Sequence, residues 1–134
     1  MSAQAILRCL LLLLCAYFDF RPLTLQRRSR FSLNAMEITL LYFDGCPNWK
    51  VADQRLQLLA AEHRELTVIH QLVETPEQAI DVGFFGSPSL QLNGADLFAE
   101  PDSQVGLACR RYNTPDGYEG APTLSQLRAA LAVE

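Results

Sequence analysis

The chain has 134 residues, of which 49% are hydrophobic and 19% are charged. This length suits one domain and excludes a large multidomain enzyme or a polytopic membrane protein, while the apolar content excludes a disordered chain. The four cysteines, Cys9, Cys15, Cys46 and Cys109, are too few and too scattered to predict a small fold built on disulfides.

Charge is unevenly distributed along the chain. Residues 1–35 carry five basic and one acidic side chain, a net charge of +4, whereas residues 36–134 carry six basic and fourteen acidic side chains, a net charge of −8. Nucleic-acid phosphates are bound by clustered Lys and Arg, so the acidic body argues against a nucleic-acid partner. The basic stretch at residues 27–30 lies outside that body and is interpreted as a solvated tail.

The amino-terminal segment, residues 1–35, contains a ten-residue apolar run, Cys9–Phe18, preceded by Arg8. A membrane-spanning helix needs about 20 such residues. The run is typical of a secretory signal, but no small-x-small cleavage site follows it. Three interpretations stay open: an export or anchor segment, a disordered tail, or a translated upstream stretch that the natural protein lacks. We expect a cytoplasmic protein, with export or membrane contact only if the run is a genuine signal or anchor.

The body begins with a predicted β-α-β unit. Glu37–Phe43 is rich in β-branched, aromatic and leucine residues and ends at the turn signal Asp44-Gly45, which predicts a buried strand. Pro47 suits the first turn of a helix, and apolar residues at helical spacing continue to about Arg64. A second strand follows at residues 66–73. The two strands should therefore be parallel, joined by a right-handed crossover.

The second half of the body predicts a short helix, a hairpin and a last helix. Thr75 caps the short helix, which ends near Gly83, and Asn93-Gly94 is a strong signal for a tight turn between strands at residues 89–92 and 95–98. Residues 99–121 read as an ordered loop, and Thr123 caps the last helix. The predicted order is β-α-β-α-β-β-α, an α/β domain at residues 36–134 with a mixed sheet of about four strands and helices on both faces.

Cys46 is the first candidate for chemistry, because it lies between a strand end and a helix start. Free N–H groups and the helix dipole at such a position favour a thiolate, the nucleophilic form of cysteine. Asp44 would oppose that effect, so we expect only a moderate lowering of the Cys46 pKa and a sulfur accessible to solvent. The alternative is a buried cysteine that acts as a small apolar residue.

These residues resemble the thioredoxin-like superfamily. The resemblance rests on the strand I-T-L-L-Y-F, the sequence D-G-C-P-N-W opening a helix, and Ser87-Pro88 before the hairpin. It implies a thioredoxin-like fold, Cys46 as nucleophile and Pro88 as a cis-proline beside the active sulfur. An ordinary trans turn proline is the alternative for Pro88.

The sequence departs from the thioredoxin motif at one position. Trp49 stands where a second cysteine of C-x-x-C would be, so C-P-N-W is similar to the single-cysteine glutaredoxin pattern. Resolution of a mixed disulfide at Cys46 would then need glutathione, another protein, or Cys109 as the resolving thiol. Pro47, Trp49 and Ser87 are expected to contact the substrate, and backbone groups near Pro88 are expected to align a partner chain.

We therefore expect a thiol–disulfide redox protein that acts on protein or small-molecule disulfides. No resident cofactor and no metal are expected, with glutathione as a candidate co-substrate. One alternative is a binding module that kept the fold and lost turnover. The other is a soft-metal or organomercurial thiol protein that uses Cys46, Cys109 and Asp44.

Overall fold

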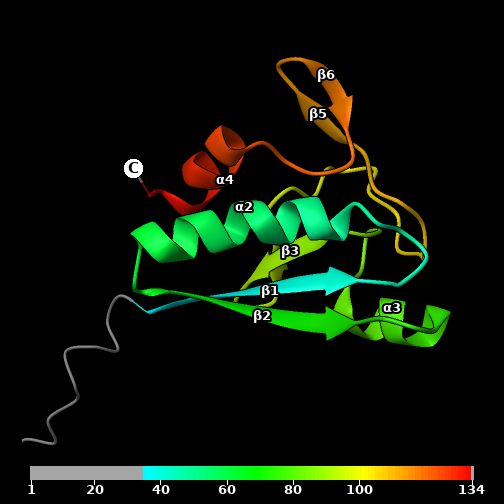
Figure 1. Ribbon diagram of the computed structural model, residues 1–134. Helices are drawn as coiled ribbons and strands as arrows, with labels where there is room; N and C mark the ends of the chain where they lie inside the picture. Colours follow the sequence, from blue (N-terminus) through cyan, green and yellow to red (C-terminus); the bar gives the residue numbers. More distant parts are fainter. Residues whose placement is uncertain (1–34, 134) are drawn as a thin grey trace, which may run out of the picture. The chain divides into compact units, whose positions relative to one another are not determined.

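The structure of the protein, a computed structural model, describes residues 35–133 (Figure 1). These residues form a mixed α/β domain with three helices, a four-stranded mixed sheet of order β2-β1-β3-β4 and a separate two-stranded sheet. The predicted α/β class and four-stranded sheet are confirmed. The predictions for the amino-terminal segment and its apolar run concern residues that lie outside the described range.

The first half of the domain is the predicted β-α-β unit. Strand β1 (Met36–Tyr42) leads through a turn to helix α2 (Trp49–Glu62), and β2 (Leu66–Leu72) then pairs parallel with β1. The helix starts two residues after Pro47, whose carbonyl oxygen accepts the Lys50 N–H at 3.1 Å. Pro47 therefore lies just before the helix, in the turn that leads into it.

The next elements are α3 (Pro76–Val82), β3 (Ser89–Leu92) and β4 (Ala95–Asp96). Helix α3 has the predicted capping box, and β3 pairs antiparallel with β1. The turn between β3 and β4 has positive φ at both central positions, as the Asn-Gly signal predicts. Strand β4 is shorter than predicted because the Asp96 carboxylate accepts the Phe98 N–H at 2.8 Å and turns the chain.

The expectation that residues 99–121 form only a loop is wrong. This stretch contains a hairpin of β5 (Tyr112–Thr114) and β6 (Gly117–Glu119), which extends away from the four-stranded sheet (Figure 1). Its turn is built on Pro115-Asp116 before Gly117, a favoured turn sequence. The chain then enters α4 (Leu124–Leu131) through the predicted capping box.

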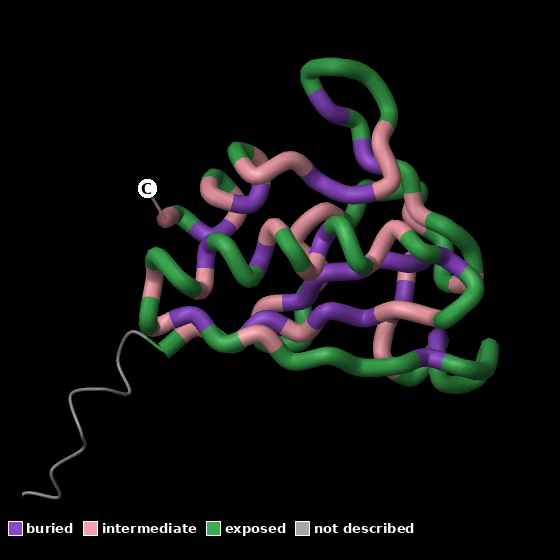
Figure 2. The backbone as a smooth tube through the Cα atoms, in the orientation of Figure 1, coloured by how far each residue is buried: buried purple, intermediate pink, exposed green. Residues whose placement is uncertain are grey.

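The core lies on both faces of the sheet, as the alternation along β1 requires. Ile38 and Leu40 pack on one face with buried residues of α2 and α4. Leu41 packs on the other face with Phe84 and with Ala79 of α3. Figure 2 shows β2 as mostly exposed beside the buried central strands. No helix within residues 35–133 combines the length and apolar character needed to cross a bilayer.

Candidate functional site

Cys46 lies three residues before α2, where the sequence predicted it, but its expected accessibility is wrong. The residue is 0% exposed. Its Sγ lies 3.5 Å from the carbonyl oxygen of Ser87, the residue before Pro88. The sulfur therefore faces the Ser87-Pro88 segment, as expected, but it is covered from solvent.

A segment that is distant in sequence lies against Cys46 and carries the second cysteine of the domain. Cys109 forms a disulfide with Cys46, with the two Cα atoms 5.7 Å apart and the residues separated by 63 positions. Cys109 is exposed, in contrast to its partner. The question left open by the sequence, whether Cys109 reaches Cys46, is answered: the two are bonded. The predicted lowering of the Cys46 pKa concerns the reduced protein and stays a prediction.

Residues 106–112, here called the Cys109 segment, pair with the backbone of Ser87. The Ser87 N–H donates to the Ala108 carbonyl oxygen at 2.8 Å, and the Arg110 N–H donates to the Ser87 carbonyl oxygen at 2.9 Å. These bonds form a parallel bridge between Ser87 and Cys109. The chain's own segment therefore occupies both backbone groups of Ser87, and the expectation that the backbone near Pro88 aligns a partner chain stays a prediction.

Gly86 allows the Cys109 segment to approach this closely. Its φ is +104°, a conformation that residues with a Cβ rarely adopt. A Cβ at this position would lie 2.8 Å from the Ala108 carbonyl oxygen. A glycine is thus needed here both for its backbone conformation and for the space it leaves.

Pro88 is buried, and the Ser87–Pro88 peptide bond is cis, as the resemblance implied. Its carbonyl oxygen accepts a hydrogen bond from the Tyr112 hydroxyl at 2.5 Å. Burial raises the pKa of Tyr112 above its ordinary value, and the nearby Arg110 only partly offsets this. The phenol therefore stays protonated and acts as the donor that joins the end of the Cys109 segment to Pro88.

Arg110 anchors the middle of the same segment. Its guanidinium donates to the two carboxylate oxygens of Asp96 at 2.7 and 3.1 Å and to the Phe98 carbonyl oxygen at 2.6 Å. The two charged side chains are only 9% and 2% exposed. Burial acts to lower the Arg110 pKa, but the bonds and charge of Asp96 outweigh it, so that the pKa is raised. A fork of charge-assisted bonds in such a buried place fixes the segment firmly.

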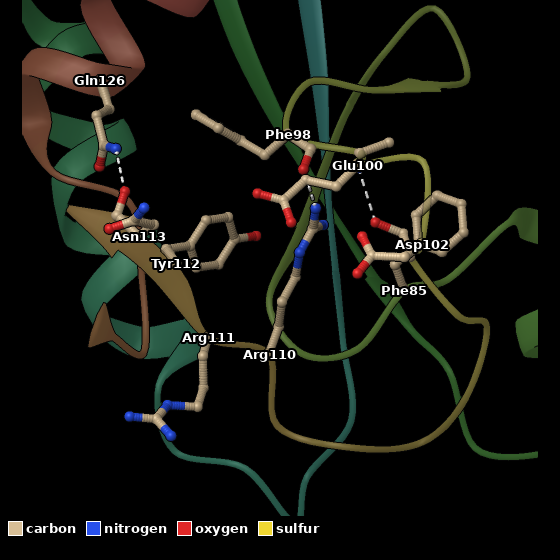
Figure 3. A pocket seen from close by; sticks show the side chains of 11 residues that line it. Phe85, Phe98, Glu100, Asp102, Arg110, Arg111, Tyr112, Asn113 and Gln126 are labelled. Carbon is tan, nitrogen blue, oxygen red and sulfur yellow. Dashed lines mark hydrogen bonds between the residues drawn. The ribbon is translucent and has the colours of Figure 1, made fainter. Parts of the chain in front are cut away.

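A cleft of about 610 Å³ opens beside Arg110 and Tyr112. Figure 3 shows that Arg110 reaches toward Phe98 whereas Arg111 projects the other way. Neither cysteine lines this cleft. The cleft is therefore lined in part by residues that follow Cys109 in the chain, and the disulfide is not part of its wall.

The other residues expected at the site lie on either side of Cys46 along the chain. Pro47 and Asp44 are exposed, and Trp49 packs on the Tyr42 ring with 4.3 Å between the ring centroids. Within residues 35–133 no group of three or more His, Cys, Asp or Glu side chains is arranged to hold a metal ion. The structure thus brings together Cys46, Cys109, Ser87 and Pro88.

Four residues that build the site were missed by the sequence interpretation: Gly86, Asp96, Arg110 and Tyr112. Gly86 stands directly before Ser87-Pro88, a signal for a special backbone conformation. No sequence signal pairs Asp96 with Arg110, because their contact depends on how the chain folds back between residues 96 and 110.

Comparison with known proteins gives no assignment. The sequence matches no protein-family model, and it matches no curated protein. The chemistry of the site therefore has to follow from the geometry of its own residues.

Proposed function

We propose that this domain has a thioredoxin-like fold and acts as a thiol–disulfide exchange protein whose redox pair is Cys46 and Cys109. One observation carries the proposal: a disulfide joins a buried cysteine at the β1–α2 junction to an exposed cysteine 63 positions away. The element order, the position of Cys46 before α2 and the position of Ser87-Pro88 before β3 support the fold.

The exposure of Cys109 favours exchange over a purely structural disulfide. A disulfide reacts when a thiolate reaches one of its sulfur atoms, so access to one end is the first requirement. The Cys109 segment is also held by contacts that do not involve sulfur, namely those of Ser87, Arg110 and Tyr112. These contacts can therefore keep the segment in its native position without the disulfide, so that the disulfide can open and close.

The exchange balances as a two-electron reaction. A thiolate RS⁻ attacks one sulfur, forms a mixed disulfide with it and releases the other cysteine as a thiolate. A second RS⁻ attacks the mixed disulfide, so that RSSR leaves and both protein cysteines are reduced. Run in reverse, the reduced protein converts RSSR to two thiols and regains its own disulfide.

The test is turnover by the full-length chain with Cys9 and Cys15 changed to Ser, so that the redox pair supplies the only cysteines. Glutathione is the reductant and hydroxyethyl disulfide the substrate, with NADPH consumption by glutathione reductase as the readout. We expect catalysis that disappears in a variant with both Cys46→Ser and Cys109→Ser. A rate equal to that of the uncatalysed reaction would reject the proposed function and leave a disulfide without turnover.

A further inference from the structure

We infer that thiols exchange at the Cys109 sulfur, with Cys46 as the buried leaving and resolving thiol, and that the substrates are small thiols and their disulfides. This inference rests on the proposed function. It reverses the roles that the sequence predicted, with Cys46 as nucleophile and Cys109 as resolving thiol. It also narrows the expected substrates, because it excludes extended protein chains.

The two cysteines differ in their access to solvent. Thiolate attack on a disulfide proceeds with the incoming sulfur, the attacked sulfur and the leaving sulfur close to a line. Cys46 is 0% exposed and Cys109 is exposed. Cys109 is therefore the end of the disulfide that an incoming thiolate meets from solvent, whereas attack on Cys46 would have to come from within the domain.

The Cys109 segment is held over Cys46 by contacts that do not depend on the disulfide. The two backbone bonds to Ser87, the Arg110–Asp96 ion pair and the bond from Tyr112 to Pro88 all remain possible when the cysteines are reduced. Arg110 and Tyr112 stand one and three positions after Cys109, so they hold the segment close to the sulfur. Reduction should therefore leave Cys46 covered.

The occupied backbone groups of Ser87 limit the size of the substrate. An extended peptide that aligned itself along Ser87 would need that residue's N–H and carbonyl oxygen. Both groups are already bonded to Ala108 and Arg110. A small thiol needs only the exposed side of Cys109, so it reacts without displacing the segment.

Written on these atoms, a small thiolate forms a bond to Cys109 Sγ while the bond between the two protein sulfurs breaks. The electron pair of that bond goes to Cys46 Sγ, which leaves as a thiolate. This thiolate takes a proton from water unless it attacks the mixed disulfide again. In the reverse direction Cys46 attacks Cys109 of the mixed disulfide and expels the small thiolate. Over the whole reaction, two electrons pass from two RSH molecules to the protein disulfide and leave RSSR. The reverse reaction returns them.

Single-cysteine variants of the full chain, again with Cys9 and Cys15 changed to Ser, separate the roles. Cys46→Ser retains Cys109 and should keep turnover of hydroxyethyl disulfide with glutathione, whereas Cys109→Ser should lose it. Iodoacetamide should modify Cys46 in Cys109→Ser at least about 100-fold more slowly than Cys109 in Cys46→Ser, because a covered thiol reacts only after local opening. Turnover by Cys109→Ser, or equal alkylation rates, would overturn the inference and leave the proposed function standing.

A second variant tests whether the segment itself is the cover. In the Cys109→Ser background, Gly86→Ala should displace the segment and speed alkylation of Cys46 by about tenfold, by raising the population of the open form. Gly106→Ala is the matched control, because a Cβ there meets no atom within 4 Å. Tyr112→Phe, which removes one hydroxyl and keeps the ring, should have a smaller effect in the same direction. Unchanged alkylation in both Gly86→Ala and Tyr112→Phe would contradict the inference.

The substrate class is tested with insulin, an extended protein substrate, against hydroxyethyl disulfide. We expect the protein with both Cys46 and Cys109 to reduce the small disulfide and to leave the rate of insulin reduction by glutathione unchanged. Catalysis of both reactions would reject the restriction to small substrates but retain the proposed function. Catalysis of neither would reject the proposed function itself.

Discussion

The two ends of the Cys46–Cys109 disulfide lie in contrasting parts of the molecule. Cys46 belongs to a region made by local sequence, where a buried strand ends and a helix begins. Cys109 belongs to a segment whose position depends largely on long-range contacts, among them those to Ser87, Asp96 and Pro88. The contrast teaches that placement before a helix does not by itself expose a cysteine to solvent, because Cys46 is buried and bonded to a segment that is distant in sequence.

Opening the disulfide should change stability most. The bond closes a loop of 63 positions, so in the chain-entropy account its loss costs about 4 kcal/mol of unfolding free energy. Urea unfolding with and without reductant measures this difference. The double variant Cys46→Ser with Cys109→Ser should show no response to reductant. A change below about 1 kcal/mol in the parent would show that the bond does not constrain the unfolded chain as the loop length implies.

Asp96→Asn should break the strongest anchor of the Cys109 segment. It leaves the Arg110 charge buried without its counter-charge, which costs about 3 kcal/mol of unfolding free energy. The control is Glu62→Gln, which breaks an ion pair with Arg128 whose acidic side chain is 51% exposed and should cost less than about 1 kcal/mol. Similar losses in both variants would mean that the buried pair does not hold the segment more firmly than a surface pair.

Gly86→Ala should destabilise the domain by about 2 kcal/mol, because the position combines a positive φ with close approach to Ala108. Chemical unfolding of the oxidised protein measures the loss. Gly106→Ala, at an open position of the same segment, should change stability by no more than about 1 kcal/mol in either direction. Equal effects at the two glycines would contradict the tight contact between Ser87 and the Cys109 segment.

Arg111→Gln should have the smallest effect. It should change only the rate of exchange at Cys109, the exposed end of the disulfide. Arg111 stands two positions from Cys109 in the same segment and does not share the Asp96 bonds of Arg110. Its positive charge should attract glutathione, which is anionic at neutral pH. We expect exchange with glutathione to slow by about two- to threefold at low salt. Exchange with 2-mercaptoethanol, whose thiolate carries one negative charge fewer than that of glutathione, should slow less, and an equal slowing of both would reject a charge effect.

The sequence predicted the elements that depend on local signals. The β-branched, aromatic and leucine residues of β1, the capping boxes at Thr75 and Thr123, and the Asn93-Gly94 turn all specify structure over a few residues, and each predicted element is confirmed. The hairpin β5–β6 was missed although Pro115-Asp116-Gly117 is a turn signal, because its strands are too short to show a period.

The candidate site was predicted only in part, for a physical reason. Cys46 was found because it follows from the predicted strand–helix order, whereas the Ser87-Pro88 segment was named through the resemblance that the sequence carries. The sequence left open whether Cys46 is buried, since its disulfide depends on the position of the Cys109 segment, which the Arg110–Asp96 ion pair and the space left by Gly86 for Ala108 help to fix. Such contacts form between residues that share no periodic pattern in the sequence.

The most direct test uses the parent chain without substitutions. The protein is reduced, the reductant is removed, and a small fraction of one equivalent of iodoacetamide is added. Peptide mass mapping then shows which cysteine carries the label. Of the label shared by Cys46 and Cys109, we expect nearly all to be on Cys109, because the Cys109 segment should continue to cover Cys46. Label on Cys46 equal to or greater than that on Cys109 would contradict it.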